Sequence, residues 1–163
     1  MRPSRVVAAV LLAVSAAHAG TANQVRKDAF RLLNEGVAAY NRAAYREAIP
    51  PLTQAASMSL NSFRAYYFLG LSLAGDRRYA DAIEAYKIAL DLDPDHLQAN
   101  VSNADAWLAQ GDADEANPFY TRALKLRAEY APALDGLARV AEAQADEEKA
   151  VAYFTRALAS DKG

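Results

Sequence analysis

The feature that most constrains the fold is a spacing of 34 residues at which small side chains recur. From Gly70, steps of this length reach Gly36, Ala104 and Ala138. Two further columns contain only alanine: Ala48, Ala82, Ala116 and Ala150, and Ala55, Ala89, Ala123 and Ala157. A fourth column is large and apolar: Leu52, Tyr86, Tyr120 and Phe154. Because the register holds without an insertion, the chain is predicted to be an array of four repeats.

Each repeat is predicted to contain two amphipathic helices. In residues 63–96, apolar side chains follow a three-and-four spacing up to Leu73, a polar break follows, and the same spacing resumes at Tyr79. This period is that of a helix with one apolar face, and Pro94 disfavours continuation of the second helix. One helical hairpin is too small to bury its apolar face alone, so neighbouring hairpins must stack. The sequence therefore predicts an all-α solenoid.

These residues resemble the tetratricopeptide repeat family over residues 29–163. The second unit carries the family's signature types at Tyr66, Leu69, Gly70, Tyr79, Ala82, Tyr86, Ala89 and Pro94. The resemblance implies an α-solenoid of about four helix–turn–helix repeats, at 29–62, 63–96, 97–130 and 131–163. Pro50, Pro51 and Pro118 depart from the pattern, because an interior proline disrupts a helix. We expect the second helices of the first and third units either to start late or to be slightly kinked.

The first 19 residues differ from the rest of the chain. Arg2 and Arg5 precede an apolar stretch at 6–17, and small residues follow at 17–19. This order is typical of a secretory signal peptide, and the apolar stretch is shorter than the roughly 20 residues of a membrane span. We expect cleavage after Ala19, no stable membrane insertion, and a periplasmic or secreted protein. The alternative is a membrane anchor. Residues 20–28 would form a short segment before the array.

In the family that the chain resembles, the first helices of the units line a concave groove that binds peptides or helices. Carried over by position, this implies a partner-binding surface at Phe30, Leu33, Val37, Tyr40, Tyr67, Phe68, Leu71 and Val101. The amino-terminal half of this surface is apolar and the carboxy-terminal half is polar. Family members that clamp a terminal carboxylate use lysine, asparagine and arginine side chains. The matching positions of this chain are Leu33, Val37, Phe68, Gln98 and Ser102, so the resemblance implies that this clamp is absent. Leu33, Val37 and Leu71 have a second interpretation, in which they pack only within the array.

Nothing in the sequence supports an enzymatic function. The full chain carries 18 Lys and Arg against 20 Asp and Glu, and no cysteine. This balance argues against a nucleic-acid partner. Neither an activated nucleophile nor a metal-ligand cluster is readable, and His96 is expected in a solvent-facing loop. We therefore predict neither a catalytic residue nor a metal or cofactor.

Together these patterns predict a non-enzymatic interaction module, an adaptor or scaffold in envelope assembly. Its groove would hold a peptide or an amphipathic helix of an envelope protein. The alternative is a structural component that self-associates through its open ends, where Tyr153 and Leu158 are expected to be partly exposed. A third interpretation, a cryptic enzyme or a carbohydrate-binding protein, is disfavoured because Trp107 is expected at a packing position.

Overall fold

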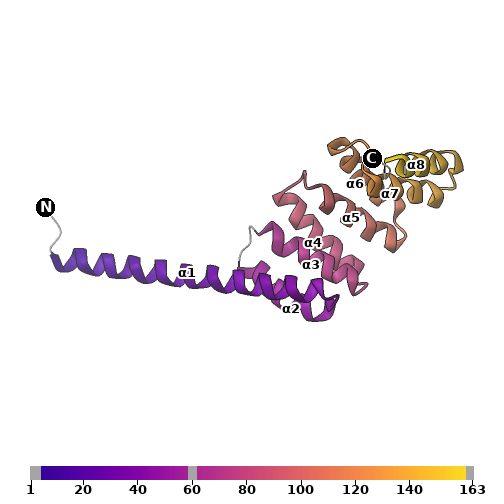
Figure 1. The fold of residues 1–163 in the computed structure, drawn as a ribbon. Helices are drawn as coiled ribbons and strands as arrows, with labels where there is room; N and C mark the ends of the chain where they lie inside the picture. The colour runs from indigo at the N-terminus through magenta and orange to yellow at the C-terminus, as the bar shows by residue number, and fades with distance from the viewer. Residues whose placement is uncertain (1–4, 59–61, 161–163) are drawn as a thin grey trace.

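The computed structural model describes residues 5–58 and 62–160, and their side chains from residue 21 onward. These residues form eight helices and no strand (Figure 1). The helices are α1 (Arg5–Asn41), α2 (Tyr45–Met58), α3 (Phe63–Gly75), α4 (Tyr79–Leu92), α5 (Leu97–Gln110), α6 (Ala113–Leu126), α7 (Ala131–Ala143) and α8 (Glu147–Ser160). The predicted all-α fold is confirmed.

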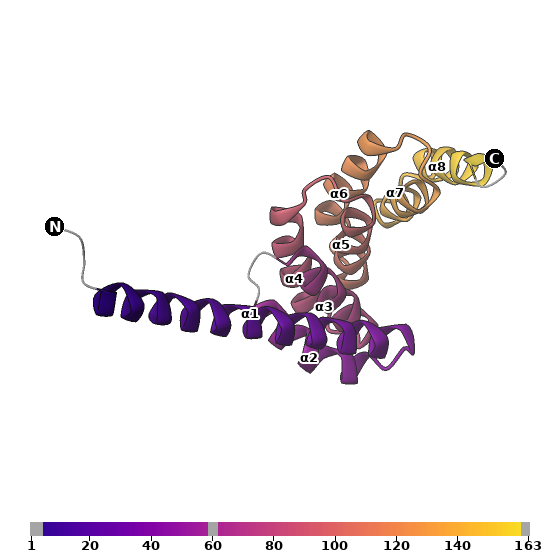
Figure 2. The same ribbon diagram turned by 60° about the vertical axis from the view of Figure 1, so that its left-hand side comes forward.

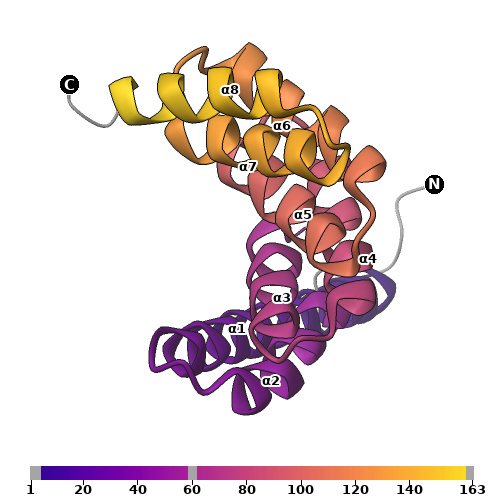
Figure 3. The same cartoon turned by 90° about the vertical axis from the view of Figure 1, so that its right-hand side faces the viewer.

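Consecutive helices pair into four hairpins, which stack along one axis and curve into an arc (Figure 3). Helices that are not consecutive touch only between α1 and α3, α3 and α5, and α5 and α7, within the part of the chain that the structure describes. The odd-numbered helices are therefore closer together than the even-numbered ones, and they line the inner side of the arc. This is the solenoid that the 34-residue spacing predicted.

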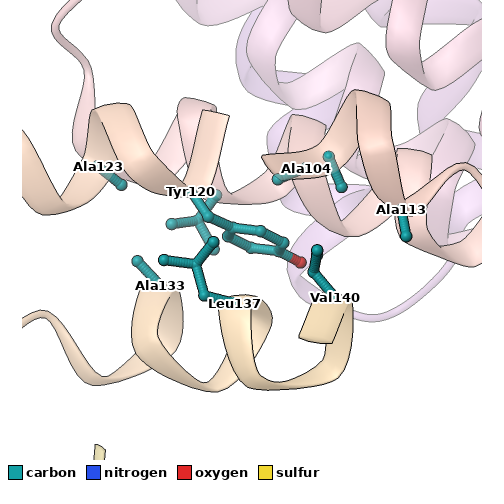
Figure 4. Close-up of a cluster of buried hydrophobic side chains, with 9 residues drawn as sticks. Ala104, Ala113, Tyr120, Ala123, Ala133, Leu137 and Val140 are labelled. Carbon is teal, nitrogen blue, oxygen red and sulfur yellow. The ribbon is translucent and has the colours of Figure 1, made fainter. Parts of the chain in front are cut away.

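The alanine columns lie where helices approach most closely. Ala48, Ala82 and Ala116 have no exposed surface, and Ala55, Ala89 and Ala123 have at most 1%. The large residues of the repeat fill the space between hairpins. At the interface between the third and fourth hairpins, the ring of Tyr120 lies between α6 and α7, against Ala133, Leu137 and Val140 (Figure 4).

Two glycines make room for large side chains of α4 and α6. A Cβ at Gly70 would lie 2.5 Å from the ring of Tyr86 in the same hairpin. A Cβ at Gly136 would collide with the ring of Tyr120, which belongs to the preceding hairpin. In the third hairpin Ala104 stands at the position of Gly70, and Tyr120 lies against the next hairpin. Gly136 is thus buried under Tyr120.

The prolines do not delay the second helices, and the prediction of a late start is wrong. α2 begins at Tyr45 and α6 at Ala113, so Pro50 and Pro118 both occupy the sixth helical position. Each proline removes the hydrogen bond to the carbonyl four residues earlier, which belongs to Arg46 or Asp114. Both of these residues are exposed, so water can satisfy the freed carbonyls.

α1 is longer than the other helices and continues from the first hairpin toward the amino terminus, where its far end projects away from the solenoid (Figures 1 and 2). The side chains of residues 21–27 are all exposed. A search of the described helices for one long and apolar enough to cross a membrane finds none. The predicted cleavage site lies in the part of α1 whose side chains are not described.

Candidate partner-binding surface

A continuous series of aromatic rings crosses the array from α1 to α5. We call Tyr40, Phe68, Tyr67, Phe63 and His96 the aromatic row. Centroid distances between successive rings are 5.5 Å from Tyr40 to Phe68, 5.7 Å from Phe68 to Tyr67, 5.5 Å from Tyr67 to Phe63 and 4.4 Å from Phe63 to His96. Tyr67 also lies 5.2 Å from His96, so it is the centre of the series. Such contacts hold the rings in a fixed arrangement.

The local sequence explains why these rings meet. Phe63, Tyr67 and Phe68 lie on α3, where a four-residue spacing puts Phe63 and Tyr67 on one face. His96 is the N-cap of α5, and its Nδ1 accepts a hydrogen bond from the backbone N–H of Ala99 at 3.1 Å. This bond fixes the imidazole against α3. His96 lies in the loop between the second and third units, as expected, and it is half-buried rather than fully exposed.

The tyrosines on this surface carry neutral hydroxyl groups at physiological pH. An ordinary tyrosine is already protonated there, and burial raises the pKa of Tyr40 and of Tyr67 further. The aromatic row thus offers broad apolar faces together with hydroxyl donors, a combination that suits recognition of a protein segment.

The groove changes character toward α5 and α7. The hydroxyl of Tyr120 donates a hydrogen bond to Asp105 Oδ1 at 2.5 Å, and Arg139 Nη1 lies 4.0 Å from the same oxygen. Partial burial raises the pKa of Asp105, and the hydrogen bond from Tyr120 and the charge of Arg139 counter this rise. Asp135 and Glu142 are also exposed on α7. This half of the surface is polar, with both signs of charge.

At the amino-terminal edge lies a hollow of about 320 Å³, here called the N-terminal hollow. Its lining comes from α1, α2 and the N-cap of α3, and consists of Arg26, Ala29, Phe30, Leu33, Ala55, Met58 and Ser62. Phe30 is 61% exposed and Met58 is 43% exposed. Exposed large apolar side chains beside a hollow are a recurrent feature of binding surfaces.

The eight residues predicted to contact a partner differ in exposure. Phe30 is exposed, and Val37, Tyr40, Tyr67, Phe68 and Leu71 are half-buried. Leu33 and Val101 are each only 8% exposed and belong to the packed clusters between helices. Whether any of the eight contacts a partner stays a prediction.

Sequence reasoning missed four residues of this surface: Arg26, Met58, Phe63 and His96. Phe63 and His96 lie at the boundaries between units, outside the helix phases that were used to place the groove. A residue directly before a predicted helix is a capping candidate, and that signal could have drawn attention to His96. Arg26 and Met58 carried no comparable signal.

A search for three or more His, Cys, Asp or Glu side chains able to hold a metal ion finds no such group in the described residues. Trp107, considered above as a sugar-stacking residue, packs against two of the buried clusters, and Lys87 Nζ lies 5.4 Å from its ring centroid.

The fold and the surface define a helical-hairpin solenoid with an aromatic groove. Family models of the tetratricopeptide repeat match residues 33–96, 69–131 and 133–163. The chain belongs to the tetratricopeptide repeat family, as the sequence pattern predicted.

One curated relative is similar in sequence: a heat shock protein sti1 homolog of Schizosaccharomyces pombe, 31% identical over 110 residues. The match covers 68% of this chain and 19% of the relative, so the chain spans about a fifth of that protein.

Solved structures resemble the fold at low sequence identity. A crystal structure of MamA matches with a TM-score of 0.79 and 22% identity, covering 83% of this chain and 79% of that chain. MamA from Desulfovibrio magneticus RS-1, residues 41 to the end, matches with a TM-score of 0.78 and 19% identity, covering 83% and 76%. The first tetratricopeptide repeat domain of Spaghetti (RPAP3), bound to an HSP90 peptide, matches with a TM-score of 0.70 and 21% identity, covering 73% and 94%.

Proposed function

We propose that this protein is a non-enzymatic adaptor that holds a segment of a partner protein in its concave groove. The observation that carries the proposal is the aromatic row, whose rings are fixed by mutual contact and half-exposed on the inner side of the arc. A structurally similar domain has been solved with a bound peptide, which supports peptide binding as a use of this fold.

The proposed ligand is an amphipathic helix or an extended segment with large apolar side chains. Its apolar side chains would lie on the aromatic row and enter the N-terminal hollow beside Phe30. Its polar groups would face Asp105 and Arg139. A terminal carboxylate is not the proposed anchor, because Leu33, Val37 and Phe68 stand where carboxylate-clamping members of the family carry basic or amide side chains.

We further propose that the protein acts in the cell envelope, after export and cleavage following Ala19. The support is the order of charged, apolar and small residues at 1–19. Amino-terminal sequencing of the protein from a fractionated native host tests this. A periplasmic or secreted chain beginning at Gly20 is expected, and an intact amino terminus on a cytoplasmic protein contradicts it.

The groove is tested by photo-crosslinking in the native host, with the probe amino acid at Tyr67. The neighbouring Tyr66 packs against the buried cluster around Leu52 and is the matched control. A second control at Glu148 lies on α8, which carries no residue of the aromatic row, and a crosslink from it to a second copy of this chain would report self-association instead of groove binding. We expect one discrete crosslinked partner from Tyr67 and not from the controls. The same background from all three positions would refute the groove as the binding surface.

The alternative proposal, a self-associating component without a peptide ligand, is favoured by a separate observation. Val151 and Leu158 on α8 are 65% and 68% exposed. Sedimentation of the purified protein at several concentrations separates the two proposals, because self-association predicts a mass that rises with concentration and a groove-binding monomer stays monomeric.

A further inference from the structure

The three interfaces between successive hairpins, here called the first, second and third junctions, are not held together alike. In the first junction, Arg46 Nε donates a hydrogen bond to Asp76 Oδ1 at 2.6 Å. In the third junction, Gln144 Nε2 donates to Asp114 Oδ1 at 2.6 Å. Each bond joins the first turn of α2 or α6 to the C-cap of the first helix of the next hairpin, α3 or α7. We call these two bonds the turn-end pairs.

The second junction has no turn-end pair. Steps of 34 residues from Arg46 and Asp76 lead to Ala80, in the first turn of α4, and Gln110, at the end of α5. The methyl group of Ala80 can neither donate nor accept a hydrogen bond, so the pair cannot form. An exposed pair of this kind stabilises a protein only weakly, so the buried side chains of the junction matter more.

The buried face of the second junction is also the least apolar of the three. At the third junction, the residues of α7 that pack against the preceding hairpin are Ala133, Leu137 and Val140 (Figure 4). The same positions of α5, at the second junction, are Ala99, Asn103 and Ala106. Asn103 is fully buried, and neither its Oδ1 nor its Nδ2 has a hydrogen-bond partner. A smaller apolar surface and an unsatisfied amide both weaken this contact.

The first junction does not share this defect. The same positions of α3 are Ala65, Leu69 and Ser72. Ser72 is the polar member of this set, and its hydroxyl group donates to the carbonyl of Phe68 at 2.8 Å. The first junction therefore has a large apolar side chain, a satisfied polar group and a turn-end pair.

A hollow of about 480 Å³ lies at the second junction, between α4, α5 and α6. Asn100 lines it, at the position where the first and third junctions have the larger apolar residues Tyr66 and Leu134. Nδ2 of Asn100 donates to the carbonyls of Pro94 and His96, at 2.9 and 3.0 Å. These two bonds fasten the connecting loop at 93–96 to α5. One end of the junction is thus fixed, whereas its interior is incompletely packed.

We propose that the array bends at the second junction, with the first two hairpins and the last two hairpins moving as two bodies about the loop at 93–96. The turn ends near Ala80 and Gln110 would separate, while the contact between His96 and Phe63 beside the loop would persist. This is a hinge motion, in which a few residues at the end of an element absorb the change. It alters the distance from the aromatic row to Asp105 on α5, and so the width of the groove. The inference does not depend on what the groove binds.

Spin-label distance measurements on the purified full chain test the hinge. The chain has no cysteine, so engineered pairs of cysteines can carry the labels. The pairs E47C/D81C, D81C/E115C and E115C/K149C span the first, second and third junctions. They use one exposed position of the repeat, in the first turn of α2, α4, α6 and α8. We expect a wider distance distribution for D81C/E115C than for the other two pairs. A distribution no wider than theirs would overturn the proposal.

Exchanging the turn-end pairs between junctions gives a matched control. A80D lets Gln110 donate to the new carboxylate as Gln144 donates to Asp114, so the D81C/E115C distribution should become narrower. D114A removes the pair from the third junction, so the E115C/K149C distribution should become wider. Ala80 and Asp114 are both exposed, so circular dichroism should show unchanged helix content.

N103L tests the interior of the second junction separately. A leucine there reproduces Leu69 and Leu137 of the other junctions, and it should also narrow the D81C/E115C distribution. If neither A80D nor N103L narrows this distribution, its width comes from the labels and not from the junction, and the proposal is wrong.

Discussion

The imidazole of His96 lies against the phenyl ring of Phe63, with ring centroids 4.4 Å apart, at the junction between the second and third hairpins. The same imidazole caps α5 by accepting the N–H of Ala99. One side chain therefore both ends the loop between two repeats and completes the aromatic row.

Replacing His96 tests this double role. H96A removes the cap and the ring contacts, and we expect the free energy of unfolding to fall by about 1–2 kcal/mol. H96N keeps a cap acceptor but lacks the ring, so its loss should be smaller. Chemical denaturation of the three proteins measures the difference. Equal losses for H96A and H96N would mean that the cap contributes nothing.

Asn103 should be a source of instability. It is fully buried on α5, and neither its Oδ1 nor its Nδ2 has a hydrogen-bond partner. The equivalent positions in the second and fourth repeats are Leu69 and Leu137. Because an unsatisfied buried polar group costs about 1–3 kcal/mol, we expect N103L to raise the free energy of unfolding by a comparable amount.

A neighbouring asparagine provides the control for N103L. Asn100 is also buried, but its Nδ2 donates to the carbonyls of Pro94 at 2.9 Å and His96 at 3.0 Å. N100L should therefore destabilise the protein. If N103L is destabilising to the same extent, Asn103 has a polar partner such as a buried water.

Gly70 should not tolerate a methyl group. G70A would place its Cβ 2.5 Å from the ring of Tyr86, and displacing that ring from a packed core costs about 1–3 kcal/mol. The helical preference of alanine over glycine offsets this by up to about 1 kcal/mol. Thermal unfolding should show a lower midpoint for G70A. In a Y86L background the same change should cost less, and an undiminished cost would place the clash elsewhere.

The protonation of Asp105 gives a pH dependence whose sign follows from its environment. Desolvation raises the pKa of Asp105, although half of its side chain stays exposed to solvent, so the folded state binds its proton slightly more tightly than the unfolded chain. This difference in proton binding stabilises the folded protein at pH values below the ordinary carboxyl pKa. The stabilisation is lost as the pH rises through the raised pKa of Asp105 in the folded state. At neutral pH we expect D105N to be at least as stable as the wild type, since the amide oxygen can still accept from Tyr120.

Unfolding of D105N and the wild type at pH 7 and pH 4 measures this effect. The advantage of D105N should shrink at the lower pH. A loss of stability for D105N at neutral pH alone would show instead that the attraction between Asp105 and Arg139 outweighs the cost of burial.

Much of the fold could be predicted because it is periodic. In the columns through Gly70, Ala82 and Ala89, small residues recur in each of the four repeats. This recurrence predicted the helices, their pairing into hairpins and the stacking of the hairpins. The prolines were harder to place. Helical phase alone does not show whether the carbonyl groups that Pro50, Pro51 and Pro118 leave without a helical partner can find another one.

The candidate surface was predictable only in part. Helical phase placed Tyr67 and Phe68 on the inner side of the arc, where the structure brings their rings together. It placed Leu33 and Val101 on the same side, but neighbouring helices cover them. Phase gives the direction of a side chain from its own helix and says nothing of how closely the next helix approaches.

The sequence by itself determined the repeating hairpin, because small and large residues at a fixed spacing permit one way of burying both helical faces. The tertiary structure decided how closely the helices approach: it set the rings of Tyr86 and Tyr120 in the spaces that the missing Cβ atoms of Gly70 and Gly136 leave. It also brought His96 onto Phe63 across a loop, a contact between residues 33 positions apart that depends on how two hairpins pack.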